Sequence, residues 1–141
     1  MKDFFSHSPA ETEAFAENLA KQLNGGEVIA FSGNLGMGKT CFVRGLARGL
    51  GFCGEVTSPT FAIINEYIGG SLPLYHFDMY RVTGWDDLYS TGYFEYSESG
   101  GVLAVEWSEN IETALPEDAI RVEICAISEN ERKITVTGGA F

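Results

Sequence analysis

The sequence predicts a single α/β domain over residues 1–141, built on a mixed, mostly parallel sheet that is flanked by helices and carries a β-hairpin. Three observations support this fold class. The chain has 141 residues, of which 45% are hydrophobic and 21% charged, as in an ordinary one-domain globular protein. A short apolar strand is followed by a glycine-rich loop and a helix, and further strand signals alternate with turn signals.

The first elements have clear local signals. Ser8 is expected to cap a helix, with Pro9 at its first position and Glu11 closing a capping box. Apolar residues then recur at helical spacing until residues 24–26, Asn-Gly-Gly, stop the pattern. The run 27–31 that follows is short, β-branched and almost wholly apolar, which is typical of a parallel strand covered on both faces.

The remaining elements follow from the same kinds of signal. They are a helix over about 39–50, a hairpin of 61–68 and 72–80 around the turn 69–71, a strand over 101–105, a short helix near 108–115, and two last strands over about 120–127 and 133–137.

The loop between the first strand and the second helix matches a known phosphate-binding pattern. Residues 33–40, Gly-Asn-Leu-Gly-Met-Gly-Lys-Thr, fit G-x-x-x-x-G-K-[ST], the P-loop. Glycines let successive N–H groups turn inward around an anion, and the helix that follows adds its positive dipole end. Lys39 supplies a full charge for the β- and γ-phosphates, and the Thr40 hydroxyl can ligate magnesium. We therefore expect nucleotide contacts from Gly33, Leu35, Gly36, Met37, Gly38, Lys39, Thr40 and Cys41.

A P-loop needs an acid to complete its metal site, and two strand ends supply candidates. Glu106 follows four uninterrupted apolar residues and is predicted to bind magnesium together with Thr40. Asp78 ends the other apolar run and is predicted to hold a metal-bound water or the attacking water. Together with Lys39, these two carboxylates are the predicted catalytic residues.

The absence of guanine-recognition motifs indicates which nucleotide is bound. The sequence contains neither the Asn-Lys-x-Asp segment that reads guanine nor a D-x-x-G motif, which favours ATP, with Mg²⁺. Residues 57–60, Thr57, Ser58, Pro59 and Thr60, are interpreted either as a switch that senses the γ-phosphate or as an ordinary turn before a strand.

Charge and composition narrow the class of partner. The net charge is −11, which disfavours direct nucleic-acid binding and suits either a basic protein partner or simple solubility. No apolar run is long enough to span a membrane and the N-terminus is unlike a signal peptide, so we expect a cytoplasmic protein. The three cysteines have no spacing typical of zinc or of disulfides.

Five segments in order give the chain a resemblance to one family. Beyond the P-loop these are Phe42-Val43-Arg44-Gly45-Leu46, Val56 to Phe61, Asn65-Glu66-Tyr67, His76 to Arg81, and Val105-Glu106-Trp107. From Thr12 to Arg132 the sequence resembles the TsaE family, the P-loop ATPases of bacterial tRNA threonylcarbamoyladenosine synthesis. Asn34 and Cys41 depart from the usual family residues, but neither is an obligatory ligand.

The resemblance implies a function and adds site residues. It implies a small ATPase that works with two proteins, TsaD and TsaB, to modify tRNA beside the anticodon without binding tRNA directly. It implies that Thr40 and Glu106 hold magnesium, that Asp78 is needed for activity and that residues 57–60 act as a switch. It further implies that Thr12 and Arg132 hold the nucleotide, with Lys133 as an alternative to Arg132.

Two other functions stay open from the sequence. A small-molecule kinase uses the same loop, but the arginine-rich lid typical of such kinases is missing. A non-hydrolysing adaptor would bind ATP without cleaving it. Because Arg44, Arg48 and Arg81 are the only candidates for an arginine finger, we expect slow hydrolysis until a partner completes the site.

Overall fold

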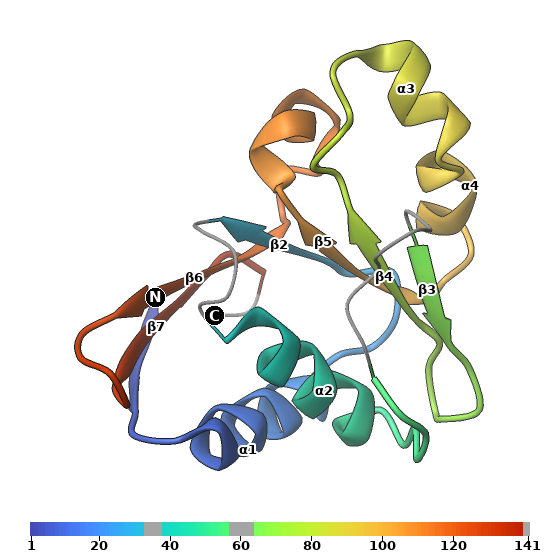
Figure 1. The fold of residues 1–141 in the computed structure, drawn as a ribbon. Helices are drawn as coiled ribbons and strands as arrows, with labels where there is room; N and C mark the ends of the chain where they lie inside the picture. The colour runs from blue at the N-terminus through green and yellow to red at the C-terminus, as the bar shows by residue number, and fades with distance from the viewer. Residues whose placement is uncertain (33–37, 57–63, 140–141) are drawn as a thin grey trace.

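The computed structural model describes residues 1–32, 38–56 and 64–139, and these form one seven-stranded sheet with helices on both faces (Figure 1). The strand order is β1-β7-β6-β2-β5-β4-β3. The strands are β1 (Lys2–Ser6), β2 (Val28–Ser32), β3 (Ile64–Tyr67), β4 (Leu74–Asp78), β5 (Val102–Glu106), β6 (Ile120–Ala126) and β7 (Arg132–Thr137). The predicted α/β class and mixed, mostly parallel sheet are confirmed.

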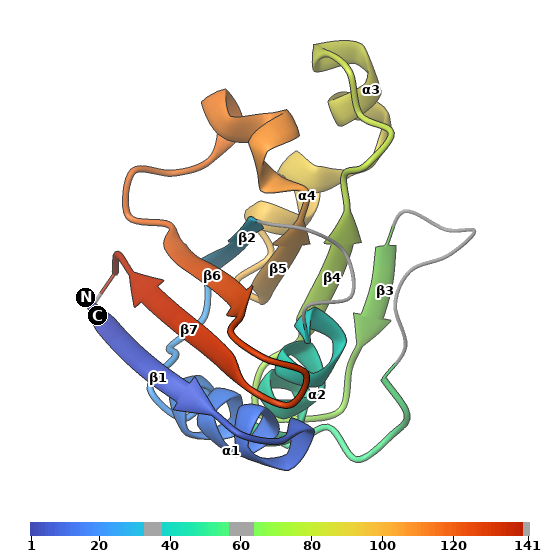
Figure 2. The same cartoon turned by 60° about the vertical axis from the view of Figure 1, so that its left-hand side comes forward.

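Parallel pairing defines the middle of the sheet. Strand β2 pairs in parallel with both β5 and β6, and β5 pairs in parallel with β4. The pairs toward the two edges, β3 with β4, β6 with β7 and β1 with β7, are antiparallel. The predicted hairpin before residue 80 is therefore confirmed. Because β2, β4 and β5 run the same way, their carboxyl ends meet at one edge of the sheet, as Figure 2 shows.

Two layers of helix cover the sheet. Helices α1 (Pro9–Ala20) and α2 (Lys39–Gly49) pack on one face, where a core cluster includes Ile29, Phe31 and Leu46. The short helices α3 (Trp85–Ser90) and α4 (Tyr93–Ser97) and the 3₁₀ helix η1 (Ser108–Ala114) contribute to a second cluster on the other face. None of the helices in the described part of the chain is long and apolar enough to cross a membrane.

The start of α1 follows the prediction with one change. Ser8 is the N-cap, its Oγ accepts a hydrogen bond from the Glu11 backbone N–H at 3.1 Å, and Pro9 is the first helical residue. The Glu11 carboxylate, however, accepts from the backbone N–H of His7 at 3.0 Å and not from Ser8, so the predicted capping box is shifted by one residue. This bond, together with one between the His7 side chain and the same carboxylate, lowers the pKa of Glu11.

Three elements were not predicted, and one differs in type. The segment near 108–115 is a 3₁₀ helix, kinked at Ile111. Strand β1 and helices α3 and α4 have no counterpart in the sequence predictions. Helix α2 ends as predicted, with Gly51 in the left-handed region at φ 91°.

Candidate active site

The two predicted acids lie side by side at the carboxyl edge of the sheet. Asp78 ends β4 and Glu106 ends β5, and the parallel register pairs them directly. Every residue of β5 is buried, including Glu106 at 5% exposure. Asp78 is half-buried, and one of its oxygens accepts a hydrogen bond from the Tyr80 backbone N–H at 3.0 Å. Carboxylate oxygens are the hard ligands that Mg²⁺ prefers.

A histidine that the sequence analysis did not select holds Glu106. His76 is fully buried, and its Nε2 lies 2.8 Å from Glu106 Oε2. A carboxylate can only accept, so Nε2 carries the proton and donates it. The other ring nitrogen, Nδ1, has no hydrogen-bond partner among the described residues. The imidazole therefore fixes one oxygen of Glu106.

The described end of the P-loop continues directly into α2. Gly38 is the N-cap with φ 95°, a conformation that favours glycine, and Lys39 is the first helical residue. Lys39 is 2% exposed, and its Nζ lies 5.9 Å from the ring centroid of Trp107, within range of a cation–π contact. Since Trp107 follows Glu106 in sequence, the Lys39 ammonium lies beside the end of β5. The other predicted loop residues, Gly33, Leu35, Gly36 and Met37, lie outside the described residues, as do Thr57, Ser58, Pro59 and Thr60.

Trp107 has an unusual backbone. It is the one residue other than glycine with positive φ in the described ranges, at φ 58° and ψ 42°. This left-handed conformation turns the chain sharply from β5 into η1. The next residue, Ser108, is buried and donates a hydrogen bond to the Phe31 carbonyl at 2.9 Å. The turn after Glu106 is thereby tied to the end of β2, just before the P-loop.

Thr12 and Arg132, far apart in sequence, line one hollow of about 230 Å³ together with Gly38 and Cys41. Thr12 is buried, and its hydroxyl lies 2.7 Å from that of Ser6. Arg132 donates to the carbonyls of Ser128, Glu129 and Glu131 in the β6–β7 turn, at 2.9, 3.3 and 3.0 Å.

Lys133, the alternative to Arg132, has a different surrounding. Its Nζ lies 5.9 Å from the ring centroid of Phe5, and it is absent from the lining of the Thr12 hollow. The structure thus brings Arg132, and not Lys133, together with Thr12, Gly38 and Cys41 beside the start of α2.

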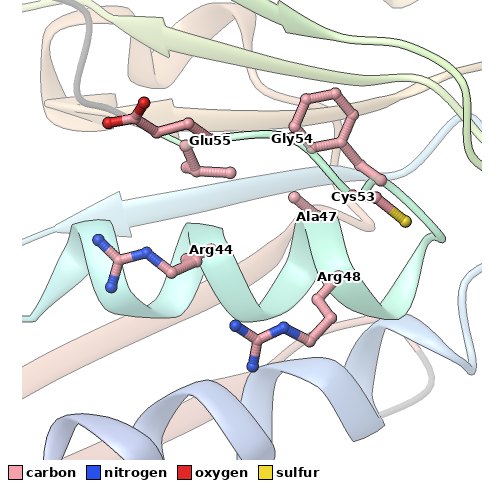
Figure 3. A pocket seen from close by; sticks show the side chains of 8 residues that line it. Arg44, Ala47, Arg48, Cys53, Gly54 and Glu55 are labelled. Atoms are coloured by element: carbon pink, nitrogen blue, oxygen red, sulfur yellow. The ribbon is translucent and has the colours of Figure 1, made fainter.

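A separate hollow of about 340 Å³ lies against the outer side of α2. Figure 3 shows Arg44 and Arg48 leaving the same side of this helix, with Glu55 on the segment across the hollow. Both guanidinium groups lie 3.5 Å from the same oxygen of Glu13 on α1. The lining includes the candidate arginine fingers Arg44 and Arg48 but none of the predicted nucleotide or magnesium ligands. Two of the three candidate arginine fingers are therefore engaged with α1, while Arg81 is exposed.

One of the site residues just described, His76, has a signal in the sequence. Strand side chains alternate between faces, so His76 lies on the same face of β4 as Asp78. A polar residue at such a position in an apolar strand is a usable signal. Trp107 carried no signal for its conformation, because the left-handed region strongly disfavours bulky residues. No group of three or more His, Cys, Asp or Glu side chains suited to a metal occurs in the ranges 1–32, 38–56 and 64–139.

A sheet with a parallel centre, a G-x-x-x-x-G-K-T sequence before α2 and strand-end carboxylates define the class of P-loop nucleotide-binding proteins. The family model described as "Threonylcarbamoyl adenosine biosynthesis protein TsaE" matches residues 6–134. The chain belongs to the TsaE family.

Individual relatives support the same assignment. The tRNA threonylcarbamoyladenosine biosynthesis protein TsaE of Bacillus subtilis is 44% identical over 130 residues, which cover 92% of this chain and 81% of that protein. The protein of the same name from Treponema pallidum is 38% identical over 131 residues, covering 93% and 96%. The crystal structure of Bacillus subtilis YdiB has a TM-score of 0.78 and 39% sequence identity, covering 97% of this chain and 84% of that one.

Proposed function

We propose that this protein is a magnesium-dependent ATPase that supports threonylcarbamoyladenosine modification of tRNA by acting on partner proteins. The observation that carries the catalytic part is the placement of Glu106. Its carboxylate is buried, oriented by His76 and paired in register with Asp78 at the edge where the P-loop helix begins. The tRNA pathway is that of the relatives, whose names place them in threonylcarbamoyladenosine biosynthesis.

The donor set fits magnesium and a nucleotide. Thr40 offers a hydroxyl and Glu106 a carboxylate oxygen, both hard ligands, and the buried imidazole of His76 holds the carboxylate in one orientation. When bound, Mg²⁺ would neutralise charge that develops on the phosphate oxygens. In the hollow beside α2, Thr12, Cys41 and Arg132 would contact the remainder of the nucleotide.

The chain's own residues supply the rest of the catalysis. Lys39 is desolvated, so its charge acts on a phosphate with little screening by water. Asp78, half-buried next to Glu106, is placed to accept a hydrogen bond from the attacking water or from a metal-bound one. Arg44 and Arg48 share Glu13, which supports slow hydrolysis by the isolated chain and a need for a partner.

The partners that we propose are TsaD and TsaB. The net charge of −11 makes this chain a poor ligand for tRNA and a good one for a basic protein surface. A basic groove that receives tRNA is a suitable counterpart for such an acidic chain.

Phosphate release tests this proposal. We expect slow, magnesium-dependent release from ATP by the chain alone and faster release with TsaD and TsaB. Glu106→Gln should lower the magnesium-dependent rate by about 100-fold, since a single preorganised charge contributes roughly that much. The exposed-acid variant Asp3→Asn is the matched control and should retain the full rate. Transfer of phosphate to a small acceptor would identify a kinase instead, and ATP-dependent binding without any release would identify an adaptor.

A further inference from the structure

Aromatic side chains form an exposed ridge beyond the carboxyl ends of β4 and β5. Tyr80, Trp85 and Tyr89 are 58%, 52% and 63% exposed, and the partly buried Phe94 lies beside Trp85 and Tyr89. The ring centroids of Tyr89 and Phe94 are 5.0 Å apart, and Trp85 lies 6.3 Å from each of these rings. We call these four residues the aromatic ridge. Tryptophan and tyrosine contribute more to the binding energy of protein interfaces than most residue types do.

Acidic residues outnumber basic ones around the ridge, although the exposed Arg81 follows Tyr80. From Val82 to Ile120 the sequence contains nine Asp and Glu residues and no Lys or Arg. Asp86, Glu95 and Glu109 are exposed there. Such a surface repels a phosphate backbone and also repels a second copy of itself. It is complementary to a protein surface that presents Lys and Arg around an apolar pocket.

The ridge is physically continuous with the candidate active site. A hollow of about 280 Å³ between α3 and η1 is lined by both Trp85 and Asn110. The Asn110 side chain donates hydrogen bonds to the carbonyls of Met79 at 2.8 Å and Tyr80 at 3.3 Å. The Tyr80 ring then packs against Trp107, with centroids 4.9 Å apart, and Trp107 lies beside the Lys39 ammonium.

We propose that the aromatic ridge is the docking surface for a basic partner protein, and that docking acts on ATP hydrolysis through Tyr80 and Trp107. Trp85 and Tyr89 enter an apolar pocket of the partner, and the surrounding acids pair with its Lys and Arg residues. The proposal rests on the function proposed above and specifies where its partner binds. It also explains why Tyr80, next to the active site, is left more than half exposed.

The test compares ridge variants with other exposed apolar residues. Binding to the purified TsaD and TsaB proteins is measured by biolayer interferometry with ATP and Mg²⁺ present. Trp85→Ala and Tyr89→Ala should each weaken binding at least about tenfold, as loss of an aromatic anchor does. The matched controls are Ile68→Ala and Ile127→Ala, whose side chains are 62% and 52% exposed at sites outside the ridge, and they should bind within about twofold of the unmodified chain.

Separate variants test the charge of the docking surface and the coupling of docking to ATP hydrolysis. Asp86→Lys should slow association and flatten its salt dependence, whereas Asp3→Lys, on the opposite edge strand β1, should not. Tyr80→Ala should lose the partner's stimulation of phosphate release, measured relative to the variant's own basal rate. Nucleotide affinity and the thermal midpoint of Trp85→Ala and Tyr89→Ala should equal those of the unmodified chain, because both side chains are exposed.

The outcomes separate the two proposals. If the unmodified chain binds TsaD and TsaB, and Trp85→Ala and Tyr89→Ala bind equally tightly, the docking proposal alone is wrong. Failure of the unmodified chain to bind TsaD and TsaB would overturn the proposed function and the ridge with it. Binding of a tRNA transcript that depends on Trp85 would overturn the ridge as a protein-docking surface.

Discussion

Replacing His76 with leucine tests the arrangement that orients Glu106. Leucine is close to histidine in volume, so the variant removes the hydrogen-bond donor without opening a large cavity. Glu106, at 5% exposure, then loses the 2.8 Å bond that holds its Oε2. We expect two measurable consequences, one for stability and one for magnesium.

The stability change follows from two opposing effects. Removing the hydrogen-bond donor of a buried carboxylate costs about 3–5 kcal/mol. Leucine also removes the buried Nδ1 of His76, which has no partner among the described residues, and this regains about 1–3 kcal/mol. The net loss in free energy of unfolding is about 2 kcal/mol, which lowers the thermal midpoint of a domain of this size by roughly 6 °C.

The effect on magnesium is expected to be larger than stability alone explains. Loss of a group that orients a metal ligand typically weakens metal binding by about 10- to 100-fold. Isothermal titration of Mg²⁺ in the presence of ATP measures this on the folded protein. Phe77→Leu is the matched control, because Phe77 is buried one residue along β4 but faces the opposite core cluster. It should lose comparable stability and keep its magnesium affinity. If His76→Leu binds Mg²⁺ as tightly as Phe77→Leu, the positioning role of His76 is wrong.

Two further variants test packing and electrostatics. Gly45→Ala should lower the free energy of unfolding by about 1–3 kcal/mol, since the new Cβ would press on the backbone carbonyl of Glu13 in α1, and helix propensity regains at most about 1 kcal/mol. Gly84→Ala, where a Cβ meets nothing within 4 Å, is the control in the same thermal melts. Arg121→Gln should raise the pKa of Glu112, measured by NMR titration, because the hydrogen bonds from Arg121 at 2.9 and 2.6 Å lower it in the unmodified chain. The pair favours folding above the ordinary pKa of Glu112, and its contribution is lost as pH falls through the lowered value; an unchanged Glu112 titration would refute this.

The elements with strong local signals were predicted, and those that are very short or depend on distant pairing were not. Strand β2 and helix α2 each carry a continuous pattern with a glycine stop, and both lie within two residues of the predicted bounds. Strand β1 exists only because it pairs with β7, more than 120 residues later in the chain. Helices α3 and α4 have six and five residues, too few to show a helical period.

For the candidate site, sequence reasoning found residue types and missed contacts. Asp78 and Glu106 could be selected because each ends an apolar run, and the register shows them adjacent. The bond from His76 to Glu106 depends on that same register between β4 and β5, which no local pattern specifies. Likewise, only the fold places Arg132 in the same hollow as Thr12.

The turn at Trp107 lies between the aromatic ridge and the candidate active site. A bulky residue in the left-handed region is strained by about 1–3 kcal/mol, and it persists only where neighbours hold it. Here the next residue, Ser108, is hydrogen-bonded to the Phe31 carbonyl, and the Tyr80 ring packs against the Trp107 ring. A displacement of Tyr80 therefore acts on a strained turn. This turn follows Glu106 in sequence, lies beside the Lys39 ammonium and is hydrogen-bonded to the end of β2. These contacts connect the aromatic ridge to the start of α2, and they are why contact at the ridge is expected to change hydrolysis and not only to anchor the partner.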